Sequence, residues 1–365
     1  MNNIFPRDAF EKVAEARGHS KEFILSALEY ADKLIKSELP VLFSTKHFCE
    51  VIDITYGELK KIILNRTNQY GNFKIRKKSG GFREIRSPKE KLKNIQKWIL
   101  NNILSKVSPH GSCIGFKKGD SIIKNALPHL GKEAILKFDL FHFFDTVTEK
   151  RVYSIFKSLG YHSNLAVDLA KLCTVPSFPS HKKKFLENFN ISDNPFPFDS
   201  FLPQGAPTSP ALANLVAGHM DKRFKGLADF LGLDYSRYAD DLTFSGNYEC
   251  LPNVNFVKKI ILEEGFYINE SKTCLRREGQ QRKVTGIIVS GDTSKVPKAY
   301  KKDIWKHLYF LNKFGVKKHL RNIKNNKSSF QDWLLGRIMF VRSVEFEEGN
   351  RMLYKYNQVN WPFYE

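Results

Sequence analysis

Three aspartates have the spacing that phosphoryl transfer on metal ions requires. Asp139 lies in the apolar run ILKFDLF, and Asp240 and Asp241 are adjacent within YADD. Two neighbouring carboxylates repel each other, and partial burial raises that cost unless a cation or a proton relieves it. A solvated turn would explain the pair alone, but the third aspartate on an apolar strand favours a Mg²⁺ site. Two such ions about 4 Å apart can activate a hydroxyl and stabilise leaving pyrophosphate.

Two other segments have the composition of a nucleotide-binding site. Arg76 and Arg83 flank a glycine turn in NFKIRKKSGGFREIRS (72–87), which can fold over a triphosphate or form a solvated basic turn. The segment LPQGAPTSP (202–210) contains a glycine that allows close backbone approach, the Gln204 amide and a predicted helix start. An ordinary loop leading into a capped helix is the alternative interpretation of this segment.

The elements that position these residues alternate between helices and strands. Apolar residues before position 70 recur at a spacing near 3.6, which predicts helices. The motif SPKE (87–90) predicts a capping box that starts a helix at Pro88. Further predicted elements are strands over 72–87, 134–144, 234–246 and 284–291, a long connecting loop over 174–202, a helix starting at 208–210, and a helical tail over 297–365. This order indicates an α+β protein.

The charge balance of the chain indicates a polyanionic partner. The 365 residues include 59 Lys and Arg against 38 Asp and Glu, a net charge of +21. No apolar run has the length of a membrane span, and the N-terminus is too polar for a secretory signal. Five scattered cysteines without a CxxC are typical of thiols in a reducing cytoplasm and give no zinc pattern. We therefore expect a cytoplasmic protein that binds nucleic acid and no membrane.

The segments FDLFHFF, LPQGAPTSP and YADD, in this order, resemble motifs A, B and C of reverse transcriptases. The resemblance implies that the three aspartates hold two Mg²⁺ ions, with Asp139 and Asp240 as the essential ligands. It implies that Phe144 is the steric gate that selects dNTPs, and that Lys272 protonates the pyrophosphate leaving group. By the same resemblance, the residues that contact the incoming nucleotide are Arg76, Arg83, Phe144 and Gln204.

Two short motifs narrow the resemblance to retron reverse transcriptases. Asn125 and His129 in NALPH match the family's NAxxH motif, and Val284, Thr285 and Gly286 match its VTG motif. The resemblance implies that both motifs bind RNA, although Asn125 could cap a turn and His129 could be a structural histidine. It further implies a cognate non-coding RNA that serves as primer and template, priming from an internal guanosine 2′-hydroxyl, and a branched RNA–DNA product (msDNA). An effector protein from the same locus and a role in anti-phage defence are also implied.

The same resemblance implies a right-hand polymerase with fingers, an antiparallel-sheet palm and a helical C-terminal thumb. We expect N-terminal helices and fingers in residues 1–130, a palm in 131–296 with a fingers-type insertion near 146–200, and a basic thumb in 297–365. Lysines and aromatics of the thumb are expected to grip a structured RNA stem, mainly by its shape; the alternative is an amphipathic helix with a solvated basic face. These thumb residues are Lys301, Lys302, Trp305, Lys306 and Tyr309.

Other functions fit the sequence less well. A group II intron-like or other bacterial reverse transcriptase would share the three motifs but not NALPH, VTG and the short thumb. An RNA-dependent RNA polymerase conflicts with Phe144, which would obstruct ribonucleotides. A non-catalytic RNA-binding scaffold would usually have lost one of the three aspartates. Metal-dependent primer extension separates an enzyme from such a scaffold.

Overall fold

The computed structural model describes residues 5–77, 80–177, 200–323 and 330–362. The chain forms two compact units, each assembled from three segments. The first unit contains Met1–Lys117, Leu140–Arg223 and Asn255–Ile268, and the second contains Lys118–Asp139, Phe224–Val254 and Asn269–Glu365.

The first unit is mainly helical. Its N-terminal helices follow the predicted 3.6-residue spacing: α2, for example, buries Ile24, Leu28 and Leu34, and begins where the Ser20 side chain accepts a hydrogen bond from the Phe23 N–H. The helices that lie wholly or largely in this unit are α1 (Arg7–Ala16), α2 (Lys21–Lys36), α3 (Thr45–Val51), α4 (Tyr56–Leu64), α5 (Glu90–Asn102), α7 (Glu149–Ser158), α8 (Ser163–Cys173), α10 (Ser209–Val216) and α12 (Val254–Glu263). Helix α11 (Gly218–Phe230) starts here and continues into the second unit.

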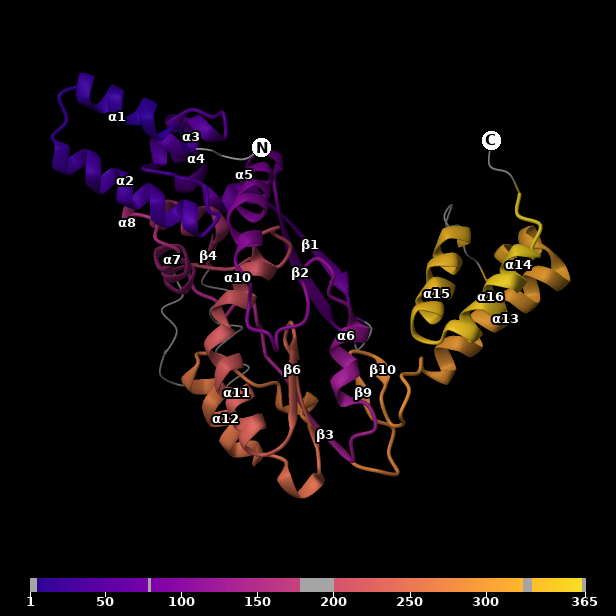
Figure 1. Cartoon of the computed structure of the whole chain (residues 1–365). Coiled ribbons are helices and arrows are strands. Elements are labelled where there is room, and N and C mark those ends of the chain that lie inside the picture. The colour runs from indigo at the N-terminus through magenta and orange to yellow at the C-terminus, as the bar shows by residue number, and fades with distance from the viewer. Residues whose placement is uncertain (1–4, 78–79, 178–199, 324–329, 363–365) are drawn as a thin grey trace. The chain divides into compact units, whose positions relative to one another are not determined.

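An antiparallel ribbon of two strands, β1 (Tyr70–Arg76) and β2 (Phe82–Pro88), confirms the predicted 72–87 hairpin (Figure 1). Lys78 and Ser79 of its turn, like residues 178–199 of the predicted long loop, lie outside the described residues. The first unit also contains the short pair β4 (Val175–Pro176) and β5 (Ser200–Phe201).

The predicted capping box at Ser87 is wrong. Ser87 and Pro88 pair with Gly71 and Tyr70 at the end of the ribbon, so they belong to β2. Helix α5 starts after them, with Lys89 at its N-cap and no side-chain cap. A ladder of cross-strand hydrogen bonds outweighs the local capping preference here.

The second unit is built around a four-stranded antiparallel sheet. Its strands are ordered β6 (Asp234–Tyr238), β7 (Asp241–Gly246), β3 (Ala134–Asp139) and β8 (Cys274–Arg276). Strand β3 ends at Asp139, five residues earlier than the predicted 134–144 strand. One face carries the buried apolar residues Leu136, Phe138, Leu242 and Phe244. Alternate residues of a strand point to opposite sides, so the other face carries Lys137, Asp139, Asp241, Thr243 and Ser245, together with the buried Ile135.

A short helix and a small ribbon accompany this sheet. Helix α6 (Ile122–Ala126) and the 3₁₀ turn η3 (Leu127–His129) precede β3, and strands β9 (Lys283–Val284) and β10 (Ile287–Ile288) form the ribbon. The strand predicted near a turn over 284–291 is shorter than expected, because Thr285 and Gly286, with φ of +46° and +87°, reverse the chain between β9 and β10.

The C-terminal part of the second unit is helical, as predicted. It consists of α13 (Lys298–Phe314), α14 (Val316–Asn322), α15 (Phe330–Val344) and α16 (Phe346–Asn357), drawn in orange to yellow in Figure 1. Their buried core includes Ile304, Leu308, Leu334 and Met352. Helices combined with antiparallel strands confirm the predicted α+β class. Among the described residues, no helix is both long enough and apolar enough to cross a membrane.

Candidate active site

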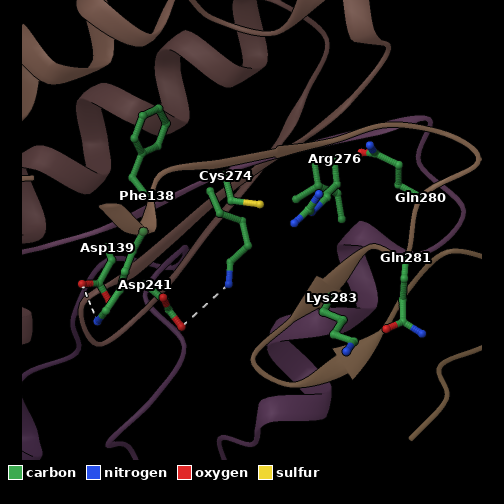
Figure 2. A pocket seen from close by; sticks show the side chains of 11 residues that line it. Phe138, Asp139, Asp241, Cys274, Arg276, Gln280, Gln281 and Lys283 are labelled. Carbon is green, nitrogen blue, oxygen red and sulfur yellow. Dashed lines mark hydrogen bonds and ion pairs between the residues drawn. The ribbon is translucent and has the colours of Figure 1, made fainter. Parts of the chain in front are cut away.

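The three aspartates lie together at one end of the four-stranded sheet. Asp139 is the last residue of β3 and Asp241 the first of β7, and the two are direct cross-strand partners. Both side chains are therefore on the polar face of the sheet, as Figure 2 shows. Asp240 occupies the two-residue turn between the paired residues Tyr238 and Asp241. Residues more than 100 positions apart in the sequence thus form one cluster of carboxylates.

The turn that carries Asp240 is held from the apolar side of the sheet. Ala239 has φ of +56°, a left-handed conformation that costs a residue with a side chain about 1 kcal/mol. The fully buried Arg237 guanidinium donates a hydrogen bond of 3.0 Å to the Ala239 carbonyl. This bond stabilises the conformation in which Asp240 stands beside Asp241.

Burial and mutual repulsion make this cluster electrostatically costly. Burial, followed by repulsion from the Asp139 and Asp241 carboxylates, raises the pKa of Asp240 from 3.8 to about 6. Burial, together with Asp139, also raises the pKa of Asp241, although Lys137 opposes this. Two lysines supply partial compensation: Lys272 Nζ lies 2.8 and 2.9 Å from the Asp139 oxygens, and Lys137 Nζ lies 3.9 Å from Asp241.

The donor set fits divalent metal ions such as Mg²⁺. Within the described ranges, no three acidic, histidine or cysteine side chains are gathered closely enough to hold a metal as they stand. Lys272 contacts both carboxylate oxygens of Asp139. The three carboxylates nevertheless supply the hard oxygen ligands that Mg²⁺ prefers. Burial and the neighbouring carboxylates both disfavour the ionised form of Asp240. A bound cation would relieve this cost.

A basic cavity of about 620 Å³ adjoins the aspartates on the polar face. Its wall includes Asp139 and Asp241, and Arg276, Gln280, Gln281 and Lys283 surround it on the side away from them, as Figure 2 shows. Cations and amides are groups that bind phosphate and sugar oxygens. The cavity therefore suits a phosphate-bearing ligand next to the carboxylates.

The predicted nucleotide-binding residues lie in the first unit. The Arg86 N–H donates a 2.8 Å hydrogen bond to the Gln204 carbonyl, which joins the 202–210 loop to β2. Gly205 has φ of +118°, and a Cβ there would lie 2.8 Å from Ile85 Cγ2, so the loop requires glycine at this position. Arg83 is two residues from Ile85 on β2 and therefore shares the face that meets the loop.

Arg76 and Arg83 do not share a face of the ribbon. The register pairs Ile75 with Arg83 and Arg76 with Phe82, so the two arginines point to opposite sides. Phe144 is half-buried in the turn that follows β3, with its ring 6.4 Å from that of Phe116. The structure thus joins Gln204 to the face that bears Arg83, while Arg76 lies on the other side.

The two short motifs, NALPH and VTG, contact each other in the second unit. The Thr285 hydroxyl donates to the Ile122 carbonyl at 3.0 Å, and Val284 packs with Ala126 in one apolar cluster. Asn125 and His129 are 1% and 0% exposed. Their side chains do not reach the surface in this structure, in contrast to the RNA-binding role expected for them. Gly286, in the turn of the ribbon, is exposed.

The thumb residues divide between two faces of α13. Lys301 Nζ bonds Glu345 at 2.7 Å, and Trp305 Nε1 donates to Glu348 at 2.9 Å, so both side chains hold helices together. The other three are exposed at helical spacing along one stripe: Lys302, Lys306 and Tyr309.

Two side chains beside the aspartates were not singled out in the sequence. Lys137 is two residues before Asp139 on β3, and this period-2 spacing could have identified it as a neighbour on the same face. Asn269 Nδ2 donates to Asp139 Oδ1 at 3.2 Å, and the Asn269 N–H donates to the Asp139 carbonyl at 2.8 Å. No spacing rule predicts this second contact, because it depends on how a loop returns to the sheet.

Comparison with known proteins identifies the family. The model of the family "Reverse transcriptase (RNA-dependent DNA polymerase)" matches residues 75–289. The chain is 33% identical over 319 residues to the retron Ec86 reverse transcriptase of Escherichia coli, covering 86% of this chain and 89% of that protein. This chain belongs to the retron reverse transcriptases. It is also 36% identical to the retron Mx65 reverse transcriptase of Myxococcus xanthus, over 71% of this chain and 61% of that protein.

Membership of this family establishes the class of reaction. The protein is an RNA-directed DNA polymerase with the mixed helix and antiparallel-sheet fold of reverse transcriptases. Reverse transcriptases generally use divalent metal ions and copy an RNA template, so this one binds RNA. Among solved structures, the telomerase of Candida albicans aligns at 14% identity and a TM-score of 0.39, covering 87% of this chain and 66% of that one.

Proposed function

We propose that this reverse transcriptase extends a primer hydroxyl with dNTPs at the cluster of Asp139, Asp240 and Asp241. The observation that carries the proposal is the cross-strand pairing of Asp139 with Asp241 beside the Asp240 turn. The three carboxylates would hold two Mg²⁺ ions. When bound, these ions activate the attacking hydroxyl and neutralise charge on the leaving pyrophosphate.

Lys272 would supply the proton to pyrophosphate. Its Nζ contacts Asp139, and its side chain is 55% exposed and lines the cavity, where it would face a bound phosphate. Lys137 and Asn269 would keep Asp241 and Asp139 in position from either side. These contacts are charge-assisted, which makes them suited to orienting carboxylates.

Nucleotide selection would depend on residues of the first unit. Arg83 and Gln204 are supported by the contact between β2 and the 202–210 loop, and Arg76 would add charge from the other face of the ribbon. Phe144 would be the steric gate that excludes a ribose 2′-hydroxyl. The division into fingers (1–130), palm (131–296, with an insertion near 146–200) and thumb (297–365) belongs to the same proposal.

The RNA partner would be the cognate retron non-coding RNA, serving as primer and template. The exposed stripe of Lys302, Lys306 and Tyr309 on α13 supports a thumb that grips a stem through phosphates and ribose hydroxyls. Gly286, exposed in the turn between β9 and β10, offers backbone for a further RNA contact. Lys301 and Trp305 would support this surface from inside the thumb.

The product would be msDNA, DNA joined to RNA through an internal guanosine 2′-hydroxyl. The support is the similarity to retron enzymes over most of the chain. An effector protein from the same locus and a role in anti-phage defence follow from the same likeness. The protein would act in the cytoplasm, where its RNA is made.

Purification of the chain from its native locus tests this proposal. The co-purifying nucleic acid would be sequenced, then treated with RNase and with an enzyme that cleaves 2′–5′ branches. A short, discrete DNA whose mobility shifts on debranching is expected. Unbranched DNA would indicate another mode of priming, and RNA alone would indicate a scaffold.

A further inference from the structure

Two serines are buried on the polar face of the hairpin that carries Asp240 and Asp241. Ser236 on β6 is 1% exposed and Ser245 on β7 is 0% exposed. Ser245 pairs with Asp234, and Ser236 pairs with Thr243, so the two serines are diagonal neighbours on one face. A hydroxyl buried in a sheet is destabilising unless it has a hydrogen-bond partner.

His129 is the partner of both serines. Its Nδ1 lies 2.6 Å from Ser245 Oγ and its Nε2 lies 2.7 Å from Ser236 Oγ, so one imidazole bridges the two strands. The ring is fully buried, and burial lowers the pKa of His129 to about 4. It is therefore neutral at physiological pH, and either tautomer is satisfied because a hydroxyl can donate or accept.

The two serines bridged by His129 lie at the same separation along the chain from the aspartates, one on each strand. Ser236 is four residues before Asp240, and Ser245 is four residues after Asp241. A change in the register of one strand against the other would break at least one of the two bonds and move the aspartates relative to each other. Both hydrogen bonds of His129 therefore form only when β6 and β7 pair in the observed register.

His129 is itself anchored at both ends of its segment. Ahead of it, the Ile122 carbonyl accepts the bond from Thr285, and behind it the Gly131 N–H donates to the Val289 carbonyl at 3.1 Å. Ala126 packs with Val284 and Val289 in one buried cluster. The segment Ile122–Gly131 is thus fixed to the β9–β10 ribbon and presents His129 to the sheet.

We propose that His129 is a positioning residue that fixes the alignment of β6 and β7, and with it Asp240 and Asp241. The NALPH and VTG motifs together then form an internal brace for the catalytic hairpin. The consequence for catalysis rests on the proposed role of the two aspartates; the structural brace does not.

The test compares His129→Phe, which keeps a ring but removes both nitrogens, with His319→Phe as a matched control. His319 is also buried, at 3% exposure, and bonds another histidine in the thumb. Primer extension on an RNA template would be measured against Mg²⁺ and dNTP concentration, with RNA affinity measured separately. Hydrogen exchange of residues 234–246 in metal-free protein gives a readout that does not depend on activity.

For His129→Phe we expect a fall in kcat of about 10²-fold, the size of a roughly 1 Å misplacement. The Mg²⁺ midpoint should rise, hydrogen exchange in 234–246 should accelerate, and the KM for dNTP and the RNA affinity should stay unchanged. His319→Phe should change none of these. Adding Ser236→Ala and Ser245→Ala to His129→Phe should cause little further loss, because the serines act through the imidazole.

Three results would overturn the proposal: wild-type kcat and exchange in His129→Phe, equal effects from His319→Phe, or a selective loss of RNA affinity. If His129→Phe does not fold, Ser245→Ala takes its place, since it removes only one hydroxyl; unchanged kcat and exchange would then overturn the brace. Activity in a protein lacking both Asp240 and Asp241 would instead refute the proposed site. In that case, hydrogen exchange of residues 234–246 still tests whether His129 braces the hairpin.

Discussion

Replacing Asp240 by asparagine should stabilise the metal-free protein while removing its activity. The folded state binds a proton at Asp240 more tightly than the unfolded state does, because burial and the other two carboxylates oppose its ionisation. The stabilisation contributed by the protonated Asp240 carboxyl is therefore fully present below the pKa of the unfolded state. It is lost as the pH rises through the pKa of the folded state. Asparagine keeps the shape of the side chain and never ionises.

The magnitude follows from the pKa of Asp240, which is raised from 3.8 to about 6. At 1.36 kcal/mol for each pKa unit, the ionised carboxylate costs about 3 kcal/mol of folding free energy above about pH 7. The advantage of Asp240→Asn should grow to about this size between about pH 4 and pH 7, and should vanish at about pH 4 and below. Bound Mg²⁺ stabilises the native state by mass action, so it should reduce the difference.

Urea unfolding in the presence of a chelator, at a series of pH values, measures this effect. Asp234→Asn is a matched control, because Asp234 lies on the same hairpin but is paired with Lys132 at 2.6 Å and is 39% exposed. Asp234→Asn should give no pH-dependent increase in the free energy of unfolding. An Asp240→Asn protein that is equal to or less stable than wild type at pH 8 would refute the electrostatic reasoning.

Three further substitutions test separate parts of the site. Phe144→Val should relax discrimination against rNTPs by about 10-fold or more, and unchanged dNTP:rNTP selectivity in single-nucleotide incorporation would remove Phe144 from the site. Gly205→Ala should destabilise the protein by about 1–3 kcal/mol, because its Cβ would lie 2.8 Å from Ile85 Cγ2 at φ +118°; an unchanged unfolding midpoint would contradict the packing of this loop. Lys272→Ala should lower kcat by about 10²-fold with little change in the KM for dNTP, and Lys272→Arg should restore part of it. Equal kcat in Lys272→Ala would mean that the contact with Asp139 is only structural.

The sequence was most informative where local pattern and chemistry agree. The hairpin at YADD was predictable, since alternating residues flank a two-residue turn and its carboxylates need a cation. The face of Asp139 was predictable only from the end of β3, where Lys137 and Asp139 alternate with the apolar Leu136 and Phe138. These features depend on residues within a few positions of each other.

Features set by distant contacts were not predictable from the sequence. Ser87 has the local signature of a helix cap, yet it pairs with Gly71 in a ribbon. His129 has the motif of an RNA contact, yet it is buried against Ser236 and Ser245, which lie more than 100 residues away in the chain. No spacing rule links residues so far apart, so only the fold reveals what each side chain touches.

The most direct test of the catalytic assignment is primer extension by a protein that carries both Asp240→Asn and Asp241→Asn. Binding of the RNA template is measured on the same preparation, with Asp234→Asn as the control. The predicted result is loss of Mg²⁺-dependent DNA synthesis with RNA affinity unchanged, while the control keeps both. DNA synthesis at the wild-type rate in the double variant would contradict the assignment of these carboxylates as the metal-binding site.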